Sequence, residues 1–161
     1  MFDNLRNKFE KHVDTFLWEM VKKFPNRVRY IDRRDGERYL LRFYLIGNRN
    51  SKGFCLFVHH FFDGDQDVDL HNHPWKISGS FILTGGYLEE RFDKNNNIKT
   101  RLFKSGYINI IRANDYHRVE LTNLINRPTW TLFFSSPRFQ DWGFKNRNTL
   151  EYVPHGKYIS G

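Results

Sequence analysis

The sequence lacks several features that would point to other kinds of protein. Its 161 residues include one cysteine, Cys55, so no intramolecular disulfide can form, which fits a reducing compartment. No apolar run approaches the ~20 residues that are needed to span a bilayer. Residues 1–4 show no basic segment followed by an apolar run, as a signal peptide would. We therefore expect an intracellular, cytoplasmic protein with no membrane association.

Sequence motifs of several large enzyme classes are also missing. There is no glycine-rich phosphate loop, no paired-cysteine motif and no nucleophile elbow. There is also no internal repeat or linker, and the length is that of one domain, residues 1–161. An aromatic content of 17% predicts a packed globular core rather than disorder.

The chain is basic, with 26 Lys and Arg against 18 Asp and Glu, a formal charge of +8. Such a charge favours the approach of an anionic partner, although it is also typical of soluble proteins in general. Basic and aromatic residues alternate between Lys22 and Tyr44, as on surfaces that stack bases and hold phosphates. Short strands with one buried face produce the same alternation, so nucleic-acid binding stays the less favoured interpretation.

Residues 4–24 have the pattern of one amphipathic helix. Apolar residues recur there at three- and four-residue spacing, and Pro25 ends the run. The apolar positions are Leu5, Phe9, Val13, Phe16, Leu17, Met20, Val21 and Phe24. We expect this helix to pack on the outside of a sheet.

After Pro25 the pattern is that of short strands separated by turns, which predicts an all-β sandwich or barrel. Residues 136–161 are predicted to form an irregular C-terminal tail. The predicted strands cover 27–31, 37–46, 54–62, 68–73, 77–83, 87–92, 98–103, 107–112, 117–121 and 129–135.

The segment 69–75 carries His71 and His73, two positions apart. On a strand, this spacing places both imidazoles on one face, with Asp69 on the same face. Two neutral imidazoles can hold a first-row transition metal if a third ligand comes from elsewhere. Without a third ligand, they would be ordinary surface or core histidines.

The third histidine is His117, and with it the sequence resembles the cupin superfamily. The first motif of that family is Gly, five residues, His-x-His, three or four residues, Glu, six residues and Gly; His71, His73 and Gly85 keep this spacing. Its second motif begins with Gly and contains a later His, and Gly106 and His117 keep that spacing. The resemblance covers residues 54–135 and is to small, uncharacterised single-domain cupins.

This resemblance implies a double-stranded β-helix, or jelly-roll barrel, over residues 27–135 with a metal bound by His71, His73 and His117. Ser78 stands where the family has its glutamate ligand, so the implied site has three histidines and no acid. That set resembles the thiol dioxygenases, which implies a mononuclear non-haem Fe(II) dioxygenase and a small anionic substrate. Zn, Ni, Mn and Cu suit the same ligands.

The resemblance also leaves an alternative in a different class. A cupin that has lost its metal can bind a small molecule, such as a sugar or a nucleotide, in the barrel without catalysis. Cupins often pair through their sheets, so a homodimer is a further expectation.

Other residues are candidates for the pocket. Strand alternation requires that one of His59 and His60 points inward, and His59 is the candidate. Trp75 can form a wall of the entrance, and Tyr87 or Tyr107 could donate a hydrogen bond to substrate. The last group is charged or polar. An inward Arg42 could clamp a carboxylate or phosphate, although an outward Arg42 on a half-exposed strand is the simpler expectation. Ser78 lies at the position of the family's glutamate ligand. Glu89 could reach inward, although we expect it to face solvent or pair with an arginine.

Overall fold

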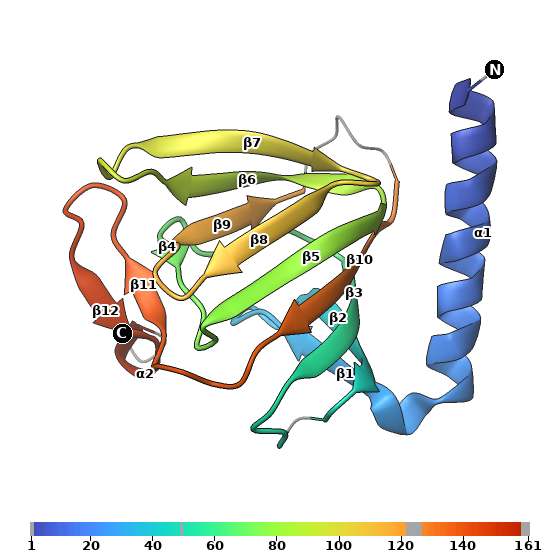
Figure 1. Cartoon of the computed structure of the whole chain (residues 1–161), viewed down its shortest axis with the longest axis horizontal. Helices are drawn as coiled ribbons and strands as arrows, with labels where there is room; N and C mark the ends of the chain where they lie inside the picture. The colour runs from blue at the N-terminus through green and yellow to red at the C-terminus, as the bar shows by residue number, and fades with distance from the viewer. Residues whose placement is uncertain (1, 49, 122–126, 159–161) are drawn as a thin grey trace.

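The computed structural model describes residues 2–48, 50–121 and 127–158. Strands dominate, with a long helix at the N-terminus (Figure 1). The helical elements are α1 (Phe2–Lys23), a short 3-10 helix (Pro25–Arg27) and α2 (His155–Tyr158). The strands are β1 (Val28–Asp32), β2 (Arg38–Ile46), β3 (Cys55–Phe61), β4 (Leu70–His71), β5 (Ile77–Thr84), β6 (Gly86–Phe92), β7 (Ile98–Lys104), β8 (Ile108–Arg112), β9 (His117–Glu120), β10 (Thr129–Ser135), β11 (Gly143–Lys145) and β12 (Tyr152–Pro154).

The strands form two antiparallel sheets that face each other. The first has the order β1-β2-β3-β10-β5-β8, and the second has the order β12-β11-β4-β9-β6-β7. Strands distant in sequence are therefore neighbours: β10 lies between β3 and β5, and β9 lies between β4 and β6. This arrangement is the predicted all-β jelly roll with an N-terminal helix outside it.

Alternation along the strands of the first sheet creates one face toward the barrel and one toward α1. On β3, His59 points into the barrel, whereas Val58 and His60 point toward the helix. His60 lies against Trp18 of α1 and Trp130 of β10, with ring centroids 5.1 and 4.5 Å apart. The prediction that one histidine of this pair faces inward is confirmed, and it is His59.

Helix α1 packs on the outer face of the first sheet, but not with the whole predicted stripe. Val21 is buried in the cluster with Leu41 and Trp130, whereas Leu5, Phe9 and Phe16 remain 60–62% exposed. The cause is a pair of polar anchors.

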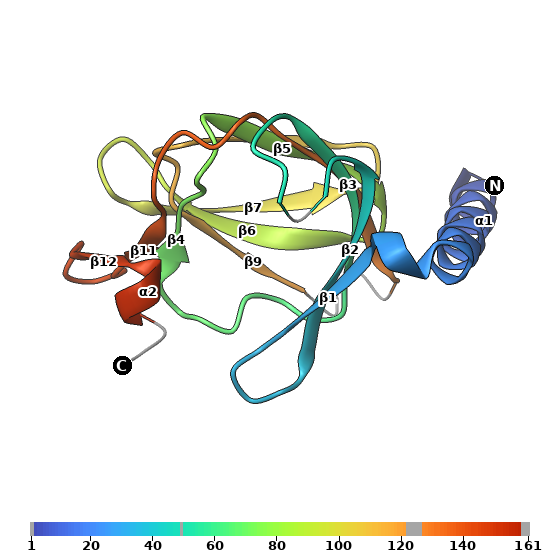
Figure 2. The ribbon, with the colours of Figure 1, turned by 90° about the horizontal axis from the view of Figure 1, so that it is seen from below.

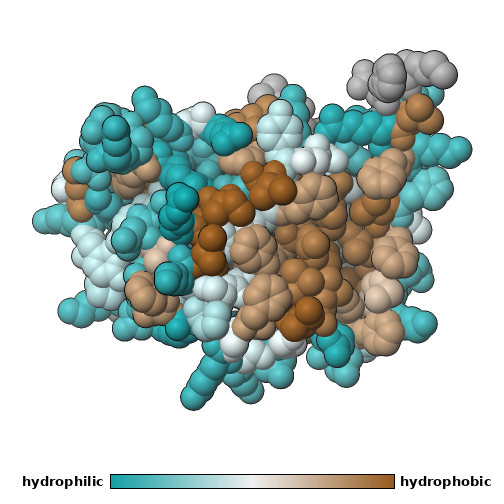
Figure 3. Space-filling model, in the orientation of Figure 1, coloured by the Kyte–Doolittle hydropathy of each residue, from teal (hydrophilic) through white to brown (hydrophobic). Residues whose placement is uncertain are grey.

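The first anchor is Glu10, which is 4% exposed and accepts a hydrogen bond from the Gly85 backbone N–H at 3.3 Å. The second is Asp14, which accepts from Trp130 Nε1 at 2.7 Å. These bonds fix which side of α1 faces the sheet. Apolar side chains consequently gather on the surface beside α1 (Figure 3). No helix among the described residues is both long and apolar enough to cross a membrane.

The prediction of an irregular tail is wrong for two segments. β11 pairs with β4, and β12 pairs with β11, so the tail extends the second sheet. Gly143 permits this pairing, because a Cβ there would lie 2.3 Å from the Val153 carbonyl oxygen. The tail strands and α2 lie at the end of the barrel away from α1 (Figure 2). This pairing places Phe144 directly opposite His71.

Candidate metal centre

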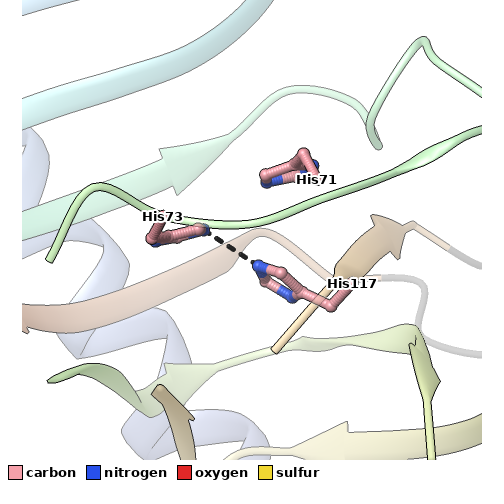
Figure 4. A group of neighbouring side chains, drawn as sticks. All are labelled: His71, His73 and His117. Atoms are coloured by element: carbon pink, nitrogen blue, oxygen red, sulfur yellow. Dashed lines mark hydrogen bonds between the residues drawn. The ribbon is translucent and has the colours of Figure 1, made fainter. Parts of the chain in front are cut away.

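The three predicted histidines meet inside the barrel (Figure 4). His71 lies on β4 opposite His117 of β9, and His73 follows β4 by two residues. One nitrogen from each ring lies within 4.8 Å of the others, and His73 Nε2 is 2.9 Å from His117 Nε2. His117 is 3% exposed, whereas His71 and His73 are half-buried.

The predicted strand over 68–73 is shorter than expected, because β4 covers only Leu70–His71. Asp69 does not join the histidines. Its carboxylate accepts hydrogen bonds from the Arg147 backbone N–H at 3.0 Å and from Asn146 Nδ2 at 3.3 Å. Asp69 therefore anchors the C-terminal segment to β4.

The second ring nitrogen of each histidine faces a polar side chain. His117 Nδ1 is 2.8 Å from Glu89 Oε1, His73 Nδ1 is 3.5 Å from Ser78 Oγ, and His71 Nδ1 is 3.9 Å from Asp65 Oδ2. These contacts leave the Nε2 atoms to converge. Partners of this kind fix the tautomer and orientation of metal-binding imidazoles.

Glu89 is the best-connected of these partners. It is 3% exposed, and its Oε1 accepts from His117 Nδ1, Arg91 Nη2 and Asn109 Nδ2, each at 2.8 Å. Burial alone would raise the pKa of Glu89, but the hydrogen bond and charge of His117, together with Arg91, lower it to about 2. The expectation that Glu89 faces solvent is wrong. Its neighbour Glu90 points to the other face of β6 and pairs with arginines there.

His71 and His73 are uncharged at neutral pH, which is the form that binds metals. Burial lowers the pKa of His71 to about 4, although Asp65 acts in the opposite direction. Burial, reinforced by His117 and His71, lowers the pKa of His73 well below its usual value. Three converging imidazole nitrogens suit a divalent transition metal, so the residues present fit the implied ion.

A cavity of about 630 Å³ opens beside the three histidines. Four further predicted residues line it: Arg42, His59, Trp75 and Tyr87. The remaining candidates lie elsewhere. Ser78 and Glu89 are buried behind the histidines that they contact. Tyr107 is 48% exposed and is not among the described lining residues, so the structure gives it no place in the site.

Tyr87 lies in the cavity wall with its hydroxyl already engaged. Its oxygen is 2.9 Å from Ser80 Oγ and accepts from Asn109 Nδ2 at 3.1 Å. Burial raises the pKa of Tyr87 to about 12, so the phenol stays protonated. Tyr87 therefore extends the polar network that begins at Glu89 and ends in the wall.

Sequence reasoning missed three residues of the site. Asp65 contacts His71, and Trp142 and His155 of the tail line the cavity with their rings stacked 4.0 Å apart. Aromatic residues in the tail were the only sequence signal for these contacts. Pairing of β11 with β4 brings the tail residues to the cavity, and the local sequence pattern does not show which distant strands will pair.

No family model matches the sequence, and no curated protein matches it. Solved structures do match the fold. They include Fe(II)-HppE with an alternative substrate (TM-score 0.52, 16% identity, 69% of this chain and 57% of that one). They also include the hydroxypropylphosphonic acid epoxidase from S. wedmorenis, with a TM-score of 0.50 and 14% identity over 69% of this chain and 56% of that one. A third is a Ralstonia eutropha protein assigned as a mannose-6-phosphate isomerase, with a TM-score of 0.50 and 17% identity over 61% of this chain and 84% of that one.

The chain thus spans 57% of the HppE chain, and the similarity is one of fold. It agrees with the two facing antiparallel sheets. The protein has a double-stranded β-helix, or jelly-roll, fold.

Proposed function

We propose that this protein is a mononuclear non-haem metalloenzyme that holds Fe(II) with His71, His73 and His117 and oxidises a small anionic substrate with O₂. The observation that carries the proposal is the convergence of three imidazoles, with no carboxylate in the set, beside a cavity. Three neutral ligands leave the +2 charge of an ion uncompensated, which favours an anionic substrate.

The surrounding residues support this role. Glu89 holds His117 by its Nδ1, so that Nε2 is free for the ion. Trp75 and Phe133, with ring centroids 5.7 Å apart, give the cavity an aromatic wall against which an organic substrate can pack. Iron(II) would supply the one-electron chemistry that reactions of O₂ require. HppE, whose fold is similar, is an Fe(II) protein.

Metal analysis of the purified protein tests the first half of the proposal. Protein expressed with added iron should contain one iron per chain, and a His71→Ala/His73→Ala variant should contain none. His155→Ala is the matched control, because this histidine lines the same cavity but lies outside the cluster.

Oxygen consumption tests the second half, with small thiols and other anionic compounds as candidate substrates. A wild-type protein that stays free of metal would contradict the proposal and favour the alternative, a cupin that binds a small molecule without catalysis.

A further inference from the structure

A row of polar side chains crosses the inner face of the first sheet, on the wall that carries Phe57, Phe61 and Phe133. Strand register places its members directly opposite one another on adjacent strands. We call this the inner polar row, and it consists of Arg29 on β1, Arg42 on β2, His59 on β3 and Thr131 on β10. All four line the same cavity as the three histidines.

Arg42 has no acidic partner among the residues that the structure describes. Its Nε donates to His59 Nε2 at 3.0 Å, and its guanidinium lies 4.7 Å from the centre of the Phe57 ring. Burial lowers the pKa of Arg42, the charge and hydrogen bond of Tyr44 act in the opposite direction, and Arg29 across the β1–β2 pair adds a like charge. An arginine remains charged in proteins, so the half-buried Arg42, which has no carboxylate partner, can bind an anion that enters the cavity.

Arginines at the mouth of the cavity differ from Arg42 because each has an aspartate. Arg33 lies 2.8 Å from Asp63, and Arg138 lies 2.7 Å from Asp141. Arg34 pairs in the same way with Asp67. Arg29 and Arg42 also line the cavity, and neither forms an ion pair with an acidic side chain among the described residues. The carboxylate of Asp65, which lines the cavity too, accepts hydrogen bonds from the Tyr39 hydroxyl and the Val119 backbone N–H instead of an arginine.

The other two members of the row add donors without adding charge. Arginine only donates, so His59 must accept at Nε2, and its proton must be on Nδ1. That Nδ1–H has no acceptor among the described residues. Thr131 is 0% exposed, and its Oγ1 has no hydrogen-bond partner within the described protein. A buried hydroxyl without a partner is rare in native proteins.

We propose that the inner polar row binds the phosphoryl or phosphonyl head of a small organic substrate. Two guanidiniums suit a dianion, and their donors, with those of His59 and Thr131, exceed what the two oxygens of a carboxylate can accept. The Phe133 ring lies 5.0 Å from the His59 ring and 6.1 Å from the His73 ring, so the body of the substrate would extend over Phe133 toward the three histidines. The reaction of such a substrate depends on the proposed function, whereas binding of its anionic head by the inner polar row does not.

Isothermal titration calorimetry with inorganic phosphate tests the site. Protein stripped of metal with a chelator is used so that phosphate cannot bind through an ion. Arg42→Gln should weaken phosphate binding at least about tenfold, since a charge-assisted hydrogen bond is lost. Thr131→Val keeps the side-chain shape and should weaken it several-fold. Arg138→Gln, the matched control, should bind like wild type, because Asp141 already neutralises that arginine.

Circular dichroism establishes that each variant is folded, and if Arg42→Gln does not fold, Arg29→Gln and Thr131→Val decide the matter. The inference is overturned if wild type does not bind phosphate, or if the folded row variants bind as tightly as Arg138→Gln does. Succinate, the carboxylate probe, should bind more weakly; equal or tighter binding overturns the assignment to a phosphoryl group.

The outcomes also separate this inference from the proposed function. If a His73→Ala variant binds phosphate and the wild type contains no iron, anion binding by the inner polar row is supported and the proposed Fe(II) function is refuted. Stoichiometric iron without phosphate binding would refute the row alone.

Discussion

Replacing Glu89 by glutamine should weaken metal binding while leaving the fold intact. In the folded protein one oxygen, Oε1, accepts all three hydrogen bonds, from His117, Arg91 and Asn109. A glutamine amide oxygen can occupy the same position and accept the same bonds, so the substitution removes the negative charge and little else. Without that charge the His117 imidazole becomes a poorer donor to a cation.

The size of the effect follows from the environment of the carboxylate. The pKa of Glu89 is about 2 rather than 4.5, because the stabilising influence of His117 and Arg91 outweighs burial. Glu89 is therefore ionised throughout the pH range in which a metal can bind. Partners of metal-binding histidines typically contribute about 10- to 100-fold to metal affinity, and we expect a loss in this range.

Competition against a chromophoric chelator at neutral pH measures this affinity, with Zn²⁺ and Fe²⁺ as the probes. Glu90→Gln is the matched control, since Glu90 is the next residue of β6 but faces away from the histidines toward Arg118 and Arg147. The reasoning is refuted if Glu89→Gln is folded, by circular dichroism, and binds both metals as tightly as Glu90→Gln.

Two further predictions concern the shell of the barrel. Burial lowers the pKa of His60 from 6.5 to about 4, so the folded protein resists protonating it: stability is full above pH 6.5 and falls as the pH drops toward 4. At pH 5 this lowers the free energy of unfolding by about 2 kcal/mol. Urea unfolding at pH 7.5 and pH 5 should therefore show a smaller loss of stability on acidification for His60→Leu than for wild type. Equal losses of stability in the two proteins would contradict this role of His60. Gly143→Ala places a methyl group 2.3 Å from the Val153 carbonyl oxygen and should destabilise the protein by about 1–3 kcal/mol, whereas Gly156→Ala, where a Cβ meets no atom within 4 Å, should melt close to wild type.

Several features of the site could be predicted because they depend on local spacing. Two histidines two residues apart, and a third at the distance of the second cupin motif, identified the cluster that β4 and β9 assemble. Alternation on β3 likewise showed that one of two adjacent histidines faces inward. Both inferences use the side-chain period of a strand, which is a property of the backbone alone.

Other features required the tertiary structure, because alternation defines two faces without saying which is inside. Arg42 on β2 was most simply an outward residue, and Glu89 on β6 a solvent-exposed one, yet both lie inside. The apolar pattern of α1 likewise did not show which of its sides packs on the sheet. Hydrogen bonds to Glu10 and Asp14 fix that side and leave part of the apolar stripe exposed.

The sequence by itself therefore determined the β architecture, the spacing of the three imidazoles and the absence of an acidic ligand among them. Closure of the barrel decided which strand faces turn inward and which distant segments meet, including the tail against β4 and the row from β1 to β10. The physical reason is that pleat and spacing are fixed within a few residues, whereas burial is decided by the whole chain at once.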